Sequence, residues 1–165
     1  VAKARLGHER DTLAPPNTAQ TRINALVELM KTETAGGERL IDNPIYKDRL
    51  MKIQGRVLAM KYNDMRVLSS RLNPGQDASL SRMITKLQGT ELRHELEGLA
   101  IDIMGEVGLS YDDNPHLRGA GSWQREYMYY LGLIIGGGTS QIQKNIISER
   151  GLGMPREPKI EKNAV

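Results

Sequence analysis

The chain has 165 residues, 39% of them hydrophobic and 26% charged, which suffices for one domain with a buried core. Lysine and arginine number 23 against 20 aspartate and glutamate, and the net charge of +3 is spread along the chain, which argues against a nucleic-acid partner. Cysteine is absent and the three histidines (His8, His94, His116) are scattered, which excludes disulfides and thiolate metal sites, and we expect no metal.

Membrane and export signals are not recognisable in the sequence. No apolar run approaches the roughly 20 residues that a membrane helix requires. The N-terminal stretch VAKARLGHER lacks the apolar core of a signal peptide. We therefore expect a protein without membrane contact, located in the cytoplasm.

The first third of the chain predicts two short helices. A first helical piece contains Glu9 and is separated from the next by the Pro15-Pro16 pair. The second helix follows the cap candidates Asn17 and Thr18 and ends before the turn at residues 35–37. Its apolar residues recur at helical spacing: Ile23, Leu26, Val27 and Met30.

A long helix is predicted between Asn43 and Asn73. Asn43 is a suitable N-cap, Pro44 suits the first helical position, and the sequence Asn73-Pro74-Gly75 stops the helix. Such a helix is about 45 Å long and needs partners of similar length. Its expected buried stripe is Tyr46, Leu50, Ile53, Val57, Met60, Met65, Leu68 and Leu72.

The next segment supplies a second long helix with the same periodicity. Asp77 or Ser79 would start this helix and Gly105 would end it. Its apolar positions are Leu80, Ile84, Leu87, Leu92, Leu96, Leu99 and Ile103.

Two further helical patterns cover residues 123–135 and 139–149, with loops at about residues 36–43, 73–78 and 105–121. No stretch alternates with the period of two that marks a half-buried strand. The sequence therefore predicts an all-α fold, a four-helix up-and-down bundle with short extra helices. Phenylalanine is absent, so leucine, isoleucine and methionine must fill its core.

Three consecutive glycines, Gly136 to Gly138, separate the last two helical patterns. Glycine permits positive φ and close approach of another group. Thr139 or Ser140 would cap the following helix, and Ser140 with Gln143 fits a reciprocal capping box. Such a helix start can bind an anion such as a pyrophosphate, although a simple tight turn explains the same pattern.

The run GGTSQIQKNIISERGLGMPRE at residues 137–157 resembles the C-terminal signature of the acyl-CoA dehydrogenases, flavoproteins whose last domain is a four-helix bundle. Upstream, LGHER (6–10), DNPIYKDRL (42–50) and KLQGTELRHELEGLAIDIMG (86–105) resemble the first three helices of that domain. A complete family member carries an N-terminal helical domain and a middle β-domain ahead of this one. The resemblance thus implies that residues 1–165 are the C-terminal domain of a longer enzyme, inactive by itself.

The resemblance also implies a chemistry, the α,β-dehydrogenation of an acyl-CoA thioester. A carboxylate removes the α-proton and FAD accepts the β-hydrogen. Many members place this glutamate in the glycine junction, where the present chain has Gly137. Members similar to the isovaleryl-CoA and long-chain dehydrogenases place it on the first helix, which points to Glu9 as the catalytic base. The alternative is a solvated Glu9 beside Arg10.

The flavin contacts implied by the resemblance are Gly138, Thr139 and Gln141 at the junction, together with Gly105. Gly105 is the only match to a Q-x-x-G-G motif at residues 102–106, and Asp102 and Glu106 would oppose a pyrophosphate. The implied partners are an acyl-CoA substrate, electron-transfer flavoprotein or a similar acceptor, and further subunits in a homo- or hetero-oligomer. A non-catalytic structural subunit of a heteromeric acyl-CoA dehydrogenase remains the alternative.

Overall fold

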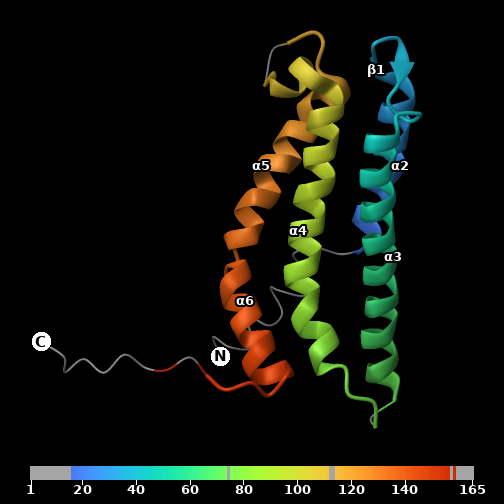
Figure 1. Cartoon of the computed structure of the whole chain (residues 1–165). Coiled ribbons are helices and arrows are strands. Elements are labelled where there is room, and N and C mark those ends of the chain that lie inside the picture. Colours follow the sequence, from blue (N-terminus) through green and yellow to red (C-terminus); the bar gives the residue numbers. More distant parts are fainter. Residues whose placement is uncertain (1–15, 74, 112–113, 157, 159–165) are drawn as a thin grey trace, which may run out of the picture.

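Helices dominate the computed structural model, which describes residues 16–73, 75–111, 114–156 and 158. The four main helices run alternately up and down, and they are α2 (Pro16–Thr32), α3 (Pro44–Leu72), α4 (Ser79–Met104) and α5 (Ser122–Ile135). A shorter helix, α6 (Ser140–Ile146), follows α5 and packs against α4 (Figure 1). The predicted all-α up-and-down bundle is confirmed. The helical piece predicted around Glu9 lies outside the described residues.

Helix α2 leads into a small hairpin that the sequence pattern did not predict. The helix begins at Pro16, slightly earlier than the predicted caps. Strand β1 (Thr34–Ala35) pairs antiparallel with β2 (Glu38–Arg39). Gly36 and Gly37 have φ values of 59° and 84°, the positive values that two-residue hairpin loops require. Strands of two residues are too short to show an alternating pattern, which explains why the prediction missed them.

Helix α3 begins and ends where its capping residues predict. Asn43 Oδ1 accepts hydrogen bonds from the backbone N–H of Ile45 (3.0 Å) and Tyr46 (3.4 Å). Asn73 caps the other end through its N–H, which donates to Ser69 O. At about 1.5 Å per residue, the helix extends along the whole bundle (Figure 1).

The predicted buried stripe of α3 is correct up to Met60 and wrong beyond it. Met65, Leu68 and Leu72 are more than half exposed, whereas Val67 and Ser70 are buried. Helical steps of three and four from Met60 lead to Asn63, Val67 and Ser70. The prediction followed apolar residues alone and therefore continued onto the outer face of the helix.

Asn63 and Ser70 occupy the inner face of α3 because their polar atoms have partners. Asn63 Nδ2 donates to Ser81 O at 3.0 Å, and Ser70 Oγ donates to Val67 O at 2.8 Å. A buried polar group with a hydrogen-bond partner avoids most of its desolvation penalty. The lower end of the α3–α4 pair is therefore held partly by polar contacts.

Helix α4 contacts α2, α3, α5 and α6 and forms the centre of the bundle. Asp77 accepts a hydrogen bond from Ser79 N (2.8 Å) just before the helix, and Gly105 ends it with φ 56°, both as predicted. Of the predicted stripe, Leu80 is 39% exposed, and the residues from Leu87 onward are buried. The core residues of α4 are Leu92, Leu96, Leu99, Ala100, Ile103 and Met104.

A second buried stripe on α4 is polar and was not predicted. Lys86, Thr90, Arg93 and Glu97 are each at most 4% exposed and recur at helical spacing. Their contacts reach α2, α5 and the junction between α5 and α6. None of the described helices is both long and apolar enough to cross a membrane.

Candidate functional site

The glycine junction joins the end of α5 to the start of α6 through a tight turn. Gly137 and Gly138 have φ values of 66° and 106°, the positive values that the glycine run predicts. Gly138 N–H donates to Ile135 O at 3.2 Å, and Gly136 N–H donates to Gly132 O at 2.9 Å. The chain therefore passes from α5 to α6 in a conformation that favours glycine, and α6 continues along α4 in the same general direction as α5 (Figure 1).

Thr139 caps α6, and the predicted capping box is wrong. Thr139 Oγ1 accepts a hydrogen bond from Ile142 N at 3.3 Å. Because Ser140 is already inside the helix, its hydroxyl instead donates to Glu91 Oε1 on α4, at 2.7 Å. Gln143 is buried, and its Nε2 donates to Gly137 O at 2.9 Å. The junction is thus fastened by side chains from both α4 and α6.

Lys86 of α4 contacts both sides of the junction. Its side chain is buried, and Nζ donates to Ile134 O at 2.9 Å and to Gly138 O at 2.7 Å. Ile134 lies in the last turn of α5, where backbone carbonyls lack intrahelical partners and the helix dipole is negative. The ammonium group therefore caps α5 and fixes the following turn.

The remainder of the polar stripe forms an ionic cluster between α2, α4 and α5. Arg22 donates from Nε (2.9 Å) and Nη2 (2.5 Å) to the fully buried carboxylate of Glu97, and Arg93 Nη2 donates to the same carboxylate at 3.1 Å. The Arg22 guanidinium also lies 3.6 Å from the ring centroid of Trp123, and that of Arg93 lies 4.4 Å from the centroid of Tyr130. Each of the two arginines is therefore both paired with a carboxylate and stacked on an aromatic ring.

A cavity of about 460 Å³ opens beside this cluster. Burial raises the pKa of the Tyr130 phenol above its ordinary value. Arg93 Nε is buried without a hydrogen-bond partner among the described residues. The lining residues are Thr18, Thr21, Arg22, Arg93, Ser122, Glu126, Tyr129 and Tyr130.

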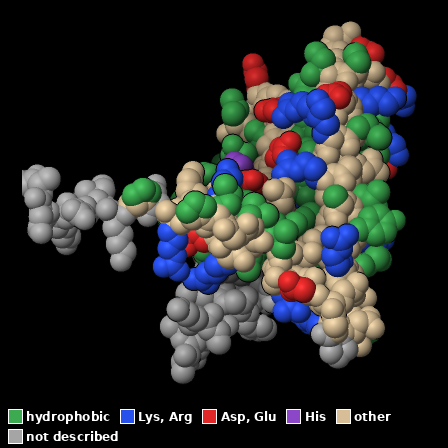
Figure 2. Space-filling view, turned by 60° about the horizontal axis from the view of Figure 1, so that its bottom comes forward, with side chains coloured by type: hydrophobic (Ala, Val, Ile, Leu, Met, Phe, Trp, Pro, Cys, Tyr) green, Lys and Arg blue, Asp and Glu red, His purple; other side chains and the backbone are tan. Residues whose placement is uncertain are grey.

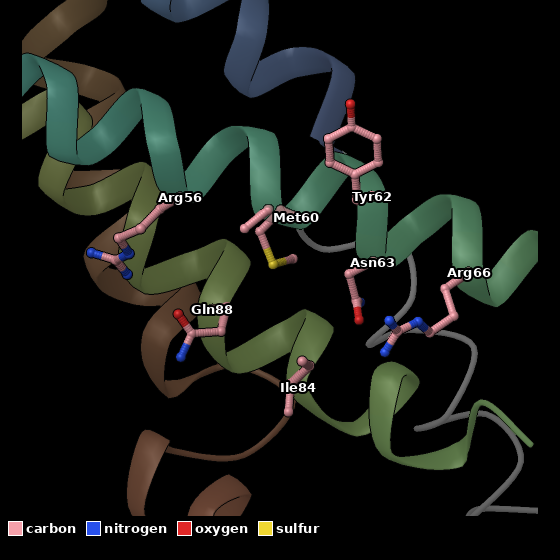
Figure 3. Close-up of a pocket in the computed structure, with 8 residues that line it drawn as sticks. Arg56, Met60, Tyr62, Asn63, Arg66, Ile84 and Gln88 are labelled. Carbon is pink, nitrogen blue, oxygen red and sulfur yellow. The ribbon is translucent and has the colours of Figure 1, made fainter.

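A second hollow, of about 350 Å³, lies between α3 and α4 (Figure 3). Arg56 and Arg66 of α3 line it together with Met60, Ile84 and Gln88. Figure 2 shows hydrophobic side chains reaching the surface among lysines and arginines. On α3 the exposed apolar residues are Ile45, Met51, Leu58, Tyr62, Met65, Leu68 and Leu72.

The predicted ligand-contact residues fall into two separate places. Gly138, Thr139 and Gln141 lie together at the junction beside Lys86. Gly105 lies at the opposite end of α4, roughly 28 Å from Lys86 along the helix at about 1.5 Å per residue. One small ligand group therefore cannot contact both places on this chain. The predicted base, Glu9, lies outside the described residues.

Gly105 is exposed, and a Cβ added there would meet no atom within 4 Å. Close approach of another molecule to this helix end is therefore unobstructed. Nearby, Asp102 accepts a hydrogen bond from Arg49 Nη2 at 2.7 Å, so its negative charge is partly offset. Asp102 should therefore repel a pyrophosphate less strongly than its charge alone predicts.

The polar groups at the junction determine which ligand contacts remain open. The N–H and the carbonyl of Gly138 are both engaged within the chain, so this residue offers close approach rather than a hydrogen bond. Thr139 uses its oxygen as an acceptor, which leaves its hydroxyl hydrogen to donate. Gln141 is exposed, and its amide has no partner within the described part of the chain. These donors fit phosphate or ribose oxygens.

Sequence reasoning missed Lys86 and Glu91 as supports of the junction. The available signal was the polar series Lys86, Thr90, Arg93 and Glu97, whose spacing places four polar residues on one helix face. Within the described ranges, no group of three or more His, Cys, Asp or Glu side chains could hold a metal ion.

Comparison with known proteins gives a consistent result. A sequence model of the family described as "Acyl-CoA dehydrogenase, C-terminal domain" matches residues 1–152. The chain is 32% identical over 163 residues to a Mycobacterium tuberculosis protein named acyl-CoA dehydrogenase IpdE1, and this match covers 96% of the chain and 39% of that protein. A protein of the same name from Mycolicibacterium smegmatis is 34% identical, over 81% of the chain and 30% of its own length.

A solved structure shares the fold. The ChsE4-ChsE5 complex from Mycobacterium tuberculosis contains a chain with a TM-score of 0.77 and 27% identity, which covers 94% of the present chain and 40% of that chain. The matches therefore span 30% to 40% of the length of these proteins.

Proposed function

Because the chain belongs to the acyl-CoA dehydrogenase family and corresponds to its C-terminal helical domain, we propose that it contributes flavin contacts and the catalytic base to an enzyme that dehydrogenates an acyl-CoA thioester. The observation that carries this proposal is the glycine junction, where Gly137 and Gly138 take positive φ directly before the capped start of α6. We further propose that residues 1–165 act as one domain of a longer, cytoplasmic protein.

The junction residues suit a flavin cofactor in complementary ways. Gly138 permits close approach of its backbone, while the Thr139 hydroxyl and the Gln141 amide can donate to phosphate or ribose oxygens. When bound, FAD would supply the redox chemistry by accepting the β-hydrogen with its electron pair. Gly105, at the far end of α4, would contact a flavin held by a neighbouring subunit.

The base must come from outside the junction in this proposal. Gly137 has no side chain, and its φ of 66° lies in a region that side-chain-bearing residues rarely adopt. Glu9, in the segment GHER, is the residue that the family's second arrangement places in this role. Its carboxylate would hold the α-proton removed from the acyl-CoA thioester.

Substitution of Glu9 by Gln in the full-length protein tests this role. Loss of a general base lowers turnover by about 10²–10⁴-fold, while flavin content should stay unchanged because the substitution preserves shape. Glu28→Gln, on the exposed face of α2, is the matched control and should retain full turnover. Turnover of Glu9→Gln within a few-fold of the original protein, measured with an electron-acceptor dye and a panel of acyl-CoA thioesters, would contradict the assignment.

A second candidate function is a non-catalytic structural subunit in a heteromeric dehydrogenase. The observation that favours it is the junction without a carboxylate, together with the acidic residues Asp102 and Glu106 beside Gly105. The solved relative that shares the fold is a complex named for two different proteins, ChsE4 and ChsE5. Visible flavin absorbance of the full-length protein, purified alone and with candidate partner chains, separates the two functions.

Further partners follow from the proposed activity. The substrate would be an acyl-CoA thioester, and the reduced flavin would pass its electrons to electron-transfer flavoprotein or a similar acceptor. The exposed apolar residues of α3 are suited to contacts with further domains or with other subunits of a homo- or hetero-oligomer. The 165-residue chain alone should show no dehydrogenase activity, and turnover of any acyl-CoA by it would contradict this expectation.

A further inference from the structure

We propose that Lys86 is a positioning residue that holds the glycine junction in its flavin-binding conformation. This inference rests on the proposed function for its flavin part, whereas the fastening of the junction stands on the geometry alone. Lys86 contacts the junction through the backbone carbonyls of Ile134 and Gly138. Its action would pass through the backbone of the junction.

The Lys86 ammonium group lies between the two sides of the glycine turn. Lys86 is 1% exposed, and its Nζ donates to Ile134 O on one side of the three glycines and to Gly138 O on the other. A single buried cation therefore connects the last turn of α5 to the residue that precedes the cap of α6. The two contacts fix the separation of the carbonyls between which the glycine turn runs.

The glycine turn is intrinsically flexible. Three successive glycines have more backbone freedom than any other sequence, and ordering them is entropically unfavourable. The contacts from Lys86 to Gly138 O, from Gln143 to Gly137 O, and from Ser140 to Glu91 limit that freedom. Of these supports, Lys86 is the one that connects both sides of the turn through one atom.

The surroundings of the Lys86 ammonium group suit a positive charge. A buried ammonium group is unfavourable unless hydrogen bonds compensate for its lost hydration. The carbonyl oxygens at the end of α5 provide that compensation, since the C-terminal end of a helix carries partial negative charge. Replacement by an apolar side chain would leave the Ile134 and Gly138 carbonyls without this partner and release the turn.

The consequence for ligand binding follows from the order of the residues. Gly138 O is held by Lys86, so the peptide plane between Gly138 and Thr139 is fixed. That plane directs the start of α6, from which the Thr139 hydroxyl and the Gln141 amide extend. Release of Gly138 would let both donors move and would weaken flavin binding.

The test compares three variants of the full-length protein, purified with its partner chain if it requires one. Lys86→Met removes the ammonium group and keeps an unbranched side chain. Lys144→Met makes the same change at an exposed position of α6. Leu96→Ala destabilises the buried core of α4 without touching the junction. Amide hydrogen exchange of residues 134–143 and the Kd of FAD for the apoprotein are measured for each.

In Lys86→Met, the backbone amides of residues 134–143 should exchange their hydrogens at least about tenfold faster than in the original protein. The Kd for FAD should rise about tenfold or more. Both controls should bind FAD within about twofold of the original protein, although Leu96→Ala loses thermal stability. Folded Lys86→Met protein with unchanged exchange at residues 134–143 would overturn the fastening role. Faster exchange with an unchanged FAD Kd would overturn the flavin part of the inference.

Failure of the proposed function gives a different result. If the original full-length protein binds no FAD with any partner, the flavin-dependent function is wrong and the flavin part of the inference falls with it. Hydrogen exchange of the Lys86→Met variant still decides whether Lys86 holds the junction.

Discussion

The buried carboxylate of Glu97 should be a major determinant of the stability of the bundle. It is fully buried and accepts three hydrogen bonds, two from Arg22 and one from Arg93. The Arg93 side chain is 5% exposed and that of Arg22 19%, so the partners are themselves largely removed from water. Glu97→Gln preserves the shape of the side chain and removes its charge.

This geometry gives the expected loss in the free energy of unfolding for Glu97→Gln. Removing one partner of a buried ionic cluster leaves uncompensated charge and costs about 3–5 kcal/mol. For a chain of this size, each kcal/mol corresponds to roughly 2–4 °C in Tm, so the Tm should fall by roughly 6–20 °C. Thermal and urea unfolding followed by far-ultraviolet circular dichroism measure both quantities.

A neighbouring glutamate on the same helix provides the control for Glu97→Gln. Glu95 pairs with Arg56, but its side chain is 48% exposed and that of Arg56 is 37% exposed. Glu95→Gln should therefore cost at most about 1 kcal/mol. If Glu97→Gln cost no more than Glu95→Gln, the conclusion that the polar stripe of α4 forms a tightly coupled buried cluster would be refuted.

Three further predictions concern other parts of the molecule. Gly137→Ala should destabilise the chain by about 1–2 kcal/mol because its φ of 66° is unfavourable for a residue with a Cβ, and unchanged urea unfolding would contradict the observed turn. Asn43→Ala should cost about 1 kcal/mol because Ile45 N–H and Tyr46 N–H lose their acceptor, which thermal unfolding can detect. Burial raises the pKa of Tyr130, so ionisation of its phenol is less favourable in the folded state than in the unfolded chain. The contribution of Tyr130 to stability is therefore fully present below the unfolded pKa of about 10 and is lost as pH rises through the folded pKa. The free energy of unfolding, measured with urea, should therefore fall less for Tyr130→Phe than for the original chain between about pH 9 and pH 11. An equal fall in both proteins would contradict the raised pKa of Tyr130.

The sequence predicted those parts of the fold that depend on local chemistry. The boundaries of α3 follow from Asn43, Pro44 and Asn73, whose preferences act within a few residues of the chain. The end of α4 at Gly105 and the positive φ of Gly137 follow from glycine itself. These features need no knowledge of the rest of the molecule.

The missed features depend on which residues face each other across the bundle. Lys86 and Glu97 look like surface residues in a sequence, because their burial is tolerable only with partners from other helices, such as Gly138 O and Arg22. Met65 looks like a core residue, because apolar character alone does not distinguish the inner face of a helix from an exposed face. The supports of the candidate site were hidden for the same reason, although the glycine junction itself was recognisable.

The proposed role in a flavin-dependent dehydrogenase is tested by the visible flavin absorbance of the full-length protein, recorded without oxygen before and after addition of acyl-CoA thioesters. We expect the protein, alone or with its partner chain, to carry FAD whose absorbance is bleached by at least one acyl-CoA. Glu9→Gln should keep the flavin and slow the bleaching by about 10²–10⁴-fold. Protein that remains colourless with every candidate partner would contradict a flavin-dependent role for this chain.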